Sequence, residues 1–363
     1  MSIVEVAKIA GTSHSTVSRV INKRPGVSPQ TEAAVKRAMA QLGYTPPAKR
    51  RGPRPADRPN VATGTIGMLM MGTDAMFARA PVTAAVFHAV EQAIASQGFN
   101  LIVGQVDDNE RLPPDVAKGQ VDGLLLHGYA PTPELRKSLA AHPSVWILSQ
   151  RSTRGYWGDR VCPDNEVIGR LAAERLLGRG HRHLAYLYFS ATHMGFRQRA
   201  ESFAETVEEY GATCAMIAEN PSTGRTTRSE DFGEDQTERV VAELLAMDPM
   251  PTGVFVPRDR LTVKVYRVLR KMGIEPGRDI EVASCDNEPI LEALDPRPAT
   301  VDVCPELIGK RAVEQLIWRM EHPNEKTRAM ITIEPEIVAP EPEMGDGPFA
   351  RVVYKSEPRG LRG

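Results

Sequence analysis

Residues 13–22 read S-H-S-T-V-S-R-V-I-N, and their spacing predicts a short helix with two unlike faces. The apolar residues Val17, Val20 and Ile21 recur at i, i+3 and i+4, so they lie on one face and can be buried together. The opposite face carries small hydrogen-bonding groups around one guanidinium, from Ser15, Ser18, Arg19 and Asn22. Small side chains allow close approach, and the arginine fork matches two acceptors on a guanine edge. Such a helix suits a DNA major groove, although the pattern alone also fits an ordinary amphipathic surface helix.

Signals on both sides of this helix predict two partners for it. Ser2 and Glu5 form a capping box that opens a first helix, which Gly11 is placed to end. Ser28 as N-cap and Pro29 at the first helical position begin a third helix. The apolar residues expected to meet between the three helices are Ile3, Val6, Ala7, Ala10, Val35, Ala38, Met39 and Leu42. The pattern predicts an all-α helix-turn-helix head over residues 1–45.

The charge of the chain is concentrated at its N-terminal end. All 363 residues together carry a formal net charge of −1. Residues 1–60 hold 11 Lys and Arg against 3 Asp and Glu, a balance of +8, which leaves −9 for the remainder. A basic head on an acidic body is typical of a nucleic-acid-binding module joined to a part that does not contact phosphates. A solvated basic tail is the alternative.

Composition excludes several other classes of protein. With 41% hydrophobic residues the chain is long enough for more than one core. Its four cysteines, Cys162, Cys214, Cys285 and Cys304, are widely spaced, so neither a metal site nor a disulfide framework is expected, and no cofactor is indicated. The chain has no apolar run before its first helix and no stretch of 18 apolar residues. We therefore expect a cytoplasmic protein without a membrane partner.

The run V-A-K-I-A-G-T-S-H-S-T-V-S-R-V-I-N, followed by V-S-P-Q-T and Q-L-G-Y-T-P, closely resembles the DNA-binding head of the LacI/GalR repressors. The similarity covers residues 6–46 nearly without a gap, and T-V-S-R-V-I-N matches the recognition helix of the family. It implies that His14 and Ser15 read bases, that Arg19 contacts a base, and that Tyr44 packs against the third helix. The residues that the resemblance places nearer phosphates are Ser13, Thr16, Ser18 and Asn22.

Residues 46–60 read P-P-A-K-R-R-G-P-R-P-A-D-R-P-N, which is too proline-rich for a helix and too basic to pack. This composition predicts a linker over residues 46–61. The family usually has a hinge helix here, with a leucine that enters the minor groove, and neither feature is present. Arg50, Arg51 and Arg54 instead surround a glycine much as in an AT-hook, whose extended chain lies in a narrow A·T-rich minor groove. The alternative is a disordered basic spacer that adds affinity by counterion release.

Beyond residue 62, apolar runs alternate with amphipathic segments. The predicted strands are 65–71, 100–105, 121–127, 145–149, 183–189, 215–218, 253–257 and 281–285. The predicted helices are 81–96, one from Pro133, 166–177, 198–210, 235–247 and 260–272. Strands with helices between them form parallel, doubly wound sheets, and two such series in succession predict an α/β core of two lobes over residues 62–340.

The resemblance to the same family continues through this core. It rests on V-D-G-L-L-L, L-A-A-E-R-L-L-G-R-G-H-R-H-L-A-Y-L, P-T-G-V-F-V-P-R-D and G-K-R-A-V-E-Q-L-I. It implies a periplasmic-binding-protein-like core whose chain crosses between lobes near residues 159–163, 297–301 and 327–333, with a helix at 305–320 that returns to the first lobe. The lobe bounds expected from it are about 62–160 and 300–326 for lobe one, and about 163–298 and 327–340 for lobe two. Residues 341–363 have no counterpart in the family and are expected to be an extended tail.

An effector is expected between the lobes, at the carboxyl ends of the strands. By the resemblance, Arg199 in R-A-E-S-F matches a ligand-binding arginine, and Asp286 in S-C-D-N matches an aspartate that accepts protons from a ligand. Arg258 and Asp259 stand where the family usually has Asn-Asp. Two arginines would favour an anionic metabolite over a neutral sugar. Alternatively, Arg258 and Asp286 could pair with each other and close the site.

Asp74 and Phe77, in the loop after the first strand, could add a polar contact and a stacking face for the effector. The alternative for each of these candidates is a structural ion pair or an exposed loop residue. The effector itself could be a sugar, a sugar derivative or an anionic metabolite.

These features together favour a homodimeric, sequence-specific transcriptional regulator, most simply a repressor, that binds a pseudo-palindromic double-stranded DNA operator. One recognition helix reads few base pairs, so two are needed, about one helical turn apart. No enzyme is expected, because the sequence has no P-loop, G-x-G-x-x-G after a strand, G-x-S-x-G or H-E-x-x-H. Two alternatives are a stand-alone ligand receptor, which would not bind an operator, and an architectural DNA binder without sequence preference.

Overall fold

The structure is a computed structural model that describes residues 3–21, 27–42, 44, 60–72, 81–106, 111–149, 156–188, 194–218 and 233–340. The chain divides into two compact units, residues 1–52 and 53–363. We call them the head and the core, and each is described by itself. The predicted linker over residues 46–61 lies outside the described residues except for its last two positions, and so does the predicted tail.

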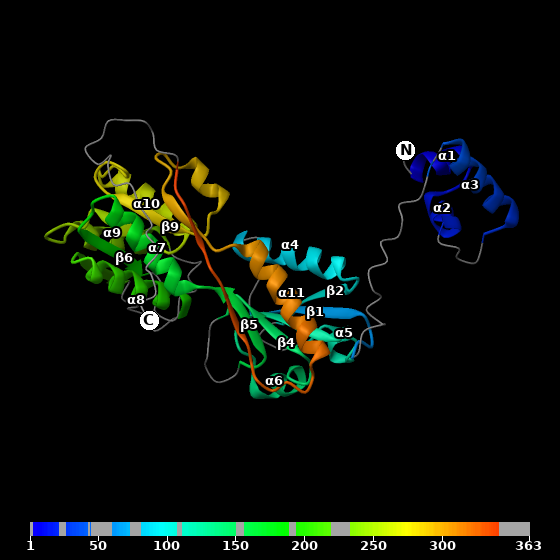
Figure 1. Cartoon of the computed structure of the whole chain (residues 1–363). Helices are drawn as coiled ribbons and strands as arrows, with labels where there is room; N and C mark the ends of the chain where they lie inside the picture. The colour runs from blue at the N-terminus through cyan, green and yellow to red at the C-terminus, as the bar shows by residue number, and fades with distance from the viewer. Residues whose placement is uncertain are drawn as a thin grey trace, which may run out of the picture. The chain divides into compact units, whose positions relative to one another are not determined.

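The head consists of helices α1 (Ile3–Ile9), α2 (His14–Ile21) and α3 (Pro29–Gln41), as predicted (Figure 1). Val6, Val17 and Val35, one from each helix, have no exposed surface and form the centre of its core. Ser28 caps α3, because its side chain accepts a hydrogen bond from the amide of Thr31 at 3.2 Å. The period of the apolar residues and the cap are local signals, which is why the sequence located these helices.

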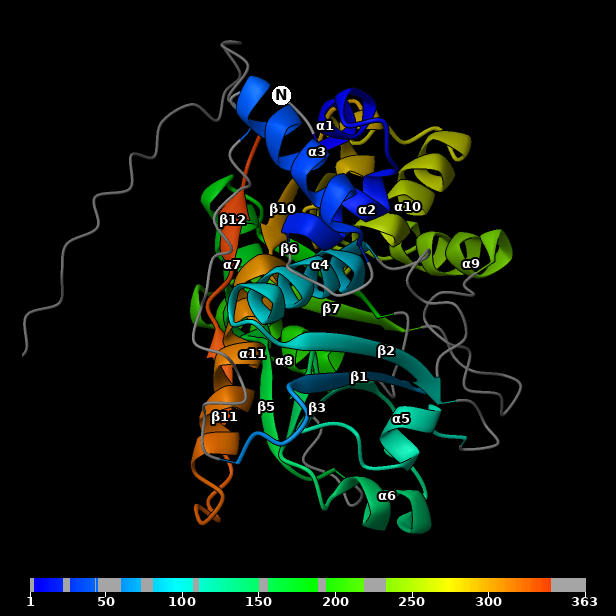
Figure 2. The same cartoon turned by 90° about the vertical axis from the view of Figure 1, so that its right-hand side faces the viewer.

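The first lobe of the core is built on a parallel sheet with strand order β11-β5-β4-β3-β1-β2 (Figures 1 and 2). Its strands are β1 (Thr65–Met71), β2 (Asn100–Val106), β3 (Gly123–Gly128), β4 (Ser144–Ile147), β5 (Asp159–Pro163) and β11 (Met330–Ile333). Helices α4 (Pro81–Ser96) and α11 (Pro305–Glu321) cover one face, and α5 (Pro114–Ala117) and α6 (Pro133–Leu139) cover the other. Both faces are therefore buried, as parallel sheets require.

The second lobe repeats this plan with strand order β12-β10-β9-β8-β6-β7, in which the β10–β12 pair alone is antiparallel. Its strands are β6 (His183–Tyr188), β7 (Thr213–Ala218), β8 (Gly253–Phe255), β9 (Glu281–Cys285), β10 (Ala299–Asp302) and β12 (Glu336–Val338). Helices α7 (Asn165–Gly178) and α8 (Met194–Glu209) cover one face, and α9 (Glu234–Leu245) and α10 (Asp259–Lys271) the other. A short 3-10 helix, η3 (Pro289–Ala293), follows β9. The two-lobed α/β core is confirmed.

Two of the expected lobe bounds differ from the sheets. Residues 300–326 were expected in lobe one, yet β10 pairs with β9 in the second sheet. Residues 327–340 were expected in lobe two, yet β11 pairs with β5 in the first sheet. Each of these strands has only a few residues. The sheet that it joins depends on pairing with a strand far away in the sequence, and the local sequence does not determine that pairing.

The chain crosses between the lobes three times, each time over a very short connection. After β5 it enters α7 through Asp164, which caps α7 by accepting hydrogen bonds from two backbone amides at 3.2 Å. After β10 it enters α11 of the first lobe through Val303 and Cys304, and after β11 it enters β12 through residues 334–335. The first two crossings leave from carboxyl ends of strands. The carboxyl edges of both parallel sheets therefore lie where the lobes join.

Candidate functional site

Of the predicted polar face of α2, the structure describes the side chain of Arg19. The Ser13 hydroxyl accepts a hydrogen bond from the Thr16 amide at 3.2 Å and lies 2.9 Å from the Thr16 hydroxyl, so it caps the first turn. Arg19 is exposed, whereas Val17 is fully buried. The guanidinium is thus presented on the side of the helix away from the core of the head.

The structure does not describe the side chains of several candidate DNA-contacting residues. His14, Ser15 and Ser18 belong to α2, but their side chains are not among those described. Asn22, Arg50, Arg51 and Arg54 lie outside the described residues, and so do the candidate effector residues Asp74 and Phe77. For these, the sequence-based assignments stay predictions.

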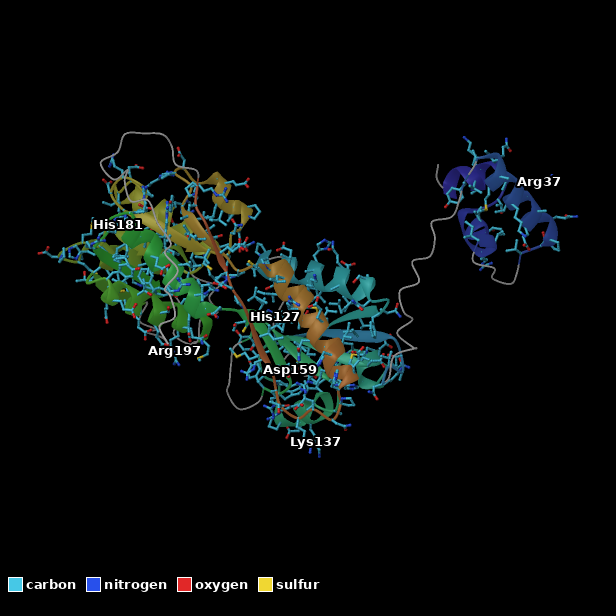
Figure 3. The ribbon with its side chains drawn as sticks, viewed as in Figure 1. Arg37, His127, Lys137, Asp159, His181 and Arg197 are labelled. Carbon is cyan, nitrogen blue, oxygen red and sulfur yellow. The ribbon has the colours of Figure 1, made fainter. Side chains whose placement is uncertain are left out.

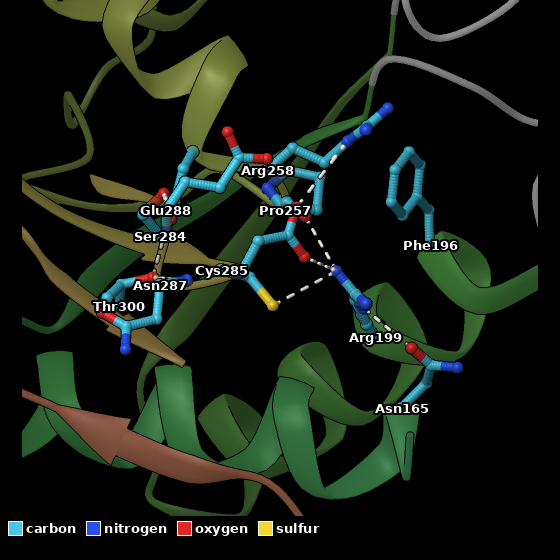
Figure 4. Close-up of polar contacts among 12 residues, drawn as sticks. Asn165, Phe196, Arg199, Pro257, Arg258, Ser284, Cys285, Asn287, Glu288 and Thr300 are labelled. Carbon is cyan, nitrogen blue, oxygen red and sulfur yellow. Dashed lines mark hydrogen bonds and ion pairs between the residues drawn. The ribbon is translucent and has the colours of Figure 1, made fainter. Parts of the chain in front are cut away.

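The remaining effector candidates come together at the carboxyl edge of the second sheet (Figure 4). Arg199, near the start of α8, is buried, with 6% of its surface exposed. Its Nε donates to Oδ1 of Asn165 at 2.8 Å, and its Nη1 donates to the carbonyl oxygen of Pro257 at 2.8 Å and to Sγ of Cys285 at 3.3 Å. The guanidinium also lies 5.5 Å from the ring centroid of Phe196. Four elements therefore fix the direction of this arginine.

Asp286, which follows β9, lies between two guanidinium groups. Its carboxylate is 4.0 Å from Nη1 of Arg199 and 3.7 Å from Nε of Arg258. Both distances exceed hydrogen-bond length, so the charges attract without forming the two-pronged contact of a close arginine–carboxylate pair. Burial raises the pKa of Asp286, and the two arginines oppose that rise. The pairing of Arg258 with Asp286, which was the alternative to ligand binding, is thus present, but it is loose.

Asp259 is held by hydrogen bonds from neighbouring elements of the second lobe. It has no exposed surface, and its carboxylate accepts hydrogen bonds from the hydroxyls of Ser284 and Thr300 and from the amide of Glu288. Burial, together with the charge of Asp286, raises the pKa of Asp259 to about 8, and these hydrogen bonds limit the rise. This network joins the start of α10 to β9 and β10, so Asp259 fixes the backbone next to Arg258.

The sequence did not indicate three of the residues that surround Arg199. Asn165, at the first turn of α7, is 4% exposed, and Cys285 and Phe196 are buried as well. Asn165 and Cys285 lie 34 and 86 residues from Arg199 along the chain, so no local pattern links them to it, whereas Phe196 precedes it by one helical turn in α8. The short crossing after β5, which brings the start of α7 to the carboxyl edge, is the signal that could have pointed to Asn165.

Burial raises the pKa of both Asp259 and Asp286. With a pKa of about 8, Asp259 is largely protonated at pH 7, so the Asp286 carboxylate faces both Arg199 and Arg258. Glu288, another buried carboxyl near Arg258, pairs with Arg260 at 3.1 Å. The two guanidinium groups beside Asp286 carry the donors that carboxylates and phosphates bind.

Two family models match the chain. The model described as "Bacterial regulatory proteins, lacI family" matches residues 2–47, and the model "Periplasmic binding protein-like domain" matches residues 173–339. The head is a lacI-family DNA-binding domain. The chain is a DNA-binding transcriptional regulator with a helix-turn-helix head and a periplasmic-binding-protein-like core, as the sequence predicted.

Curated relatives are similar to this chain over nearly their whole length. The HTH-type transcriptional repressor PurR of Vibrio cholerae serotype O1 (strain M66-2) is 29% identical over 348 residues, which is 93% of this chain and 96% of the repressor. The Ribose operon repressor of Haemophilus influenzae is 28% identical over 342 residues, covering 92% and 96%. The head and both lobes are thus present together in these repressors.

Solved structures show the same fold as this chain. The transcriptional regulator CelR–cellobiose complex is similar with a TM-score of 0.62 and 24% identity, over 93% of this chain and 98% of that one. The lac repressor dimer bound to operator and the anti-inducer ONPF is similar with a TM-score of 0.59 and 21% identity, over 93% and 97%. Among the described residues, no helix has the length and apolar character needed to cross a membrane.

Proposed function

We propose that this regulator is a homodimeric repressor of a pseudo-palindromic operator, and that an anionic small molecule bound beside Arg199 and Arg258 changes its affinity for that operator. The observation that carries the proposal is the sharing of one carboxylate, Asp286, between two guanidinium groups at the carboxyl edge of the second sheet. The PurR and ribose operon repressors, which are similar along the whole chain, support the repressor role.

In the head, Arg19 carries the main base contact. It is exposed on α2, and its fork can donate two hydrogen bonds to a guanine. We assign base reading to His14 and Ser15 as well, and phosphate contacts to Ser13, Thr16, Ser18 and Asn22. Arg50, Arg51 and Arg54 of the linker follow the minor groove at the operator centre. Two heads in a two-fold dimer then read two half-sites about one helical turn apart.

In the core, a phosphate or carboxylate of the effector binds Arg199 and Arg258, and Asp286 accepts a hydrogen bond from a hydroxyl or amine of the same molecule. Asp74 and Phe77 complete the site from the first lobe. A sugar that carries an acidic group satisfies this chemistry. Solved relatives that contain cellobiose or ribose are consistent with a sugar-like frame, and the additional arginine at position 258 supports the acidic group.

A matched pair of ligands tests the effector class. A thermal-shift screen of the full chain compares phosphorylated and carboxylated sugars with their neutral parent sugars. We expect the acidic members to raise the melting temperature and to change operator affinity in fluorescence anisotropy, because a ligand stabilises the state it binds. If the neutral parents bind equally well, the anionic assignment is wrong.

We also infer that the chain has no catalytic role and acts where the operator DNA is, in the cytoplasm. The lack of the four catalytic motifs named above supports the first point. A stand-alone ligand receptor and a non-specific architectural DNA binder are the competing functions. Selection of an operator from a random DNA library by the purified chain distinguishes them, since the receptor would select nothing and the architectural protein would show no sequence preference.

A further inference from the structure

Three residues other than glycine adopt left-handed backbone conformations close to the effector site. They are Asp286 with φ of 115°, Asn287 with φ of 49°, and Cys304 with φ of 54°. Such conformations are unfavourable for residues with a Cβ atom, although Asn and Asp tolerate them better than most. They persist where surrounding contacts determine the backbone, and they are concentrated at functional sites.

The carboxylate of Asp302 is the contact that two of these residues share. Its Oδ2 accepts a hydrogen bond from Nδ2 of Asn287 at 2.8 Å, and its Oδ1 accepts one from the amide of Cys304 at 2.7 Å. Asn287 directly follows the candidate effector residue Asp286. Cys304 is the N-cap of α11, where the chain enters the first lobe. One carboxylate thus links the loop that carries Asp286 to the first residue of a helix in the other lobe.

Two further hydrogen bonds hold the loop that carries Asp286 against β10. The amide of Asp286 donates to the carbonyl oxygen of Val301 at 2.9 Å, and the amide of Asn287 donates to the hydroxyl of Thr300 at 3.2 Å. The loop is therefore bonded to β10. A shift of the Asp286 backbone would displace the carboxyl end of that strand. Asp302 also lies opposite Glu336, the first residue of β12, so the second and third crossings meet beside it.

Helix α11 is packed so that it cannot absorb such a shift locally. A Cβ atom at Gly309 would lie 2.6 Å from the carbonyl oxygen of Val86 and 2.7 Å from Cβ of Ala89, so α11 and α4 are in backbone contact. Ile308, Val313 and Leu316 are buried in the core of the first lobe. A displacement at the N-terminus of α11 is therefore a displacement of the helix against its lobe.

We propose that Asp302 is a positioning residue of the effector site. Through Asn287 it directs the Asp286 carboxylate, and through Cys304 it transmits a change at Asp286 to the start of α11 in the first lobe. The inference rests on the proposed function for the meaning of Asp286, but the transmission itself can be measured without an effector.

The test follows hydrogen exchange at the first turn of α11 in the full chain. The amides of Leu307 and Ile308 donate to the carbonyl oxygen of Cys304 and report on this turn. Asp286→Asn, which removes the charge at the effector site, should change their exchange rates by at least about fivefold, the lower range of coupling between linked sites. In an Asn287→Gly background, which keeps the left-handed backbone but removes the link to Asp302, the same change at Asp286 should have no effect.

Two further variants separate positioning from general stability. Asp302→Asn keeps the shape of the side chain but only one acceptor oxygen, so it should also abolish the response to Asp286→Asn. Glu336→Gln, beside Asp302 but without a hydrogen bond to Asn287 among the described contacts, should leave the response intact. A residue with a merely structural role would change the basal exchange rate and leave the response to Asp286→Asn in place.

Inorganic phosphate, added at constant ionic strength, serves as the probe for the proposed function. It should alter the same two amides in the unmodified chain and not in Asn287→Gly. If Asp286→Asn acts on α11 but phosphate does not, the anionic effector is in doubt and the transmission stands. If Asp286→Asn leaves Leu307 and Ile308 unchanged, or still acts through Asn287→Gly, the role of Asp302 is overturned.

Discussion

Gly169 of α7 lies against the backbone of α8 at Arg199. A Cβ atom at this glycine would fall 2.2 Å from the carbonyl oxygen of Arg199 and 2.9 Å from the amide nitrogen of Phe203. The contact is with backbone, which cannot turn aside as a side chain can. The absence of a Cβ at Gly169 therefore sets the distance between two helices, and with it the place of the buried guanidinium.

Gly169→Ala should push α8 away from α7. Overpacking of this kind costs about 1–3 kcal/mol, and the melting temperature should fall by several degrees. Effector affinity should fall as well, because Arg199 moves from Asn165, while operator affinity in the absence of effector is retained. Calorimetry and anisotropy measure the two affinities. Glu205→Ala, at an exposed position of α8, is the control that should change neither effector affinity nor operator affinity.

Arg19→Ala should abolish the preference for the operator while the protein stays folded. The loss of one bidentate base contact costs about 1–3 kcal/mol per half-site. Arg37→Ala removes the same charge from the surface of α3 (Figure 3) and should not alter sequence preference. Selection from a random DNA library compares the variants. Recovery of the same operator by Arg19→Ala would show that α2 is not the recognition helix.

Arg199→Ala should remove the effector response without weakening operator binding. It also leaves the buried Asp286 with Arg258 as its cationic neighbour, so the core should lose about 3–5 kcal/mol of stability. Arg199→Lys retains the charge and should fold better, but it lacks the fork. Arg197→Ala, an exposed change in the same helix (Figure 3), is the control and should respond normally. Unchanged effector affinity in Arg199→Ala, measured by calorimetry, would contradict the assigned role.

The stability of the core should fall as pH rises toward 8, through Asp259. Its pKa in the folded protein is raised to about 8, above the ordinary value of 3.8. A carboxyl with a raised folded pKa stabilises the folded state while it is protonated, so its contribution is complete below about pH 4 and is lost as pH passes through 8. Asp259→Asn cannot titrate and should show a smaller decline over this range. Urea denaturation of both proteins from pH 5 to 8 makes the comparison, and parallel curves would refute it.

Replacing Arg51 and Arg54 by Ala should reduce the salt dependence of operator binding. Each lost phosphate neutralisation lowers the slope of log affinity against log salt by roughly 0.9, so the change is roughly two per chain. Discrimination for an A·T-rich operator centre should weaken as well, because an arginine in the minor groove senses groove width. The preferences within each half-site should survive. Equal affinity of the unmodified chain for A·T-rich and G·C-rich centres would leave only a basic spacer.

The helices and strands were largely predictable because their signals are local. The cap at Ser28, the apolar run of β1 and the strand Glu281–Cys285 were located to within a residue or two. The resemblance to the family placed Arg199 and Asp286 in one site, and the structure brings both of them and Arg258 together. The period of the apolar residues predicted the three helices of the head and eight strands of the core, but it did not predict the short strands β5, β10, β11 and β12.

The details of the site were not predictable in the same way. The hydrogen bonds of Arg199 to Asn165 and Cys285 join residues far apart in sequence, and the burial that raises the pKa of Asp259 is a property of the packed lobe. The sheet to which β10 and β11 belong depends on pairing with distant strands. The left-handed backbone conformations of Asp286, Asn287 and Cys304 were not predictable, because glycine, the usual signal of such a conformation, is absent at these positions.

The return of α11 and β11 to the first sheet has a consequence for the order in which the protein is made. Ile308, Val313, Leu316 and Ile333 complete the apolar core of the first lobe, yet the ribosome adds them after nearly all of the second. Until then the face of β3, β4 and β5 that α11 covers stays open to solvent, and exposed apolar surface of this kind favours aggregation. Most of the second lobe can fold before the first lobe is complete. Release of the chain before residue 333 would therefore leave a lobe that cannot finish folding, and nascent chains of that length should be the ones that chaperones bind.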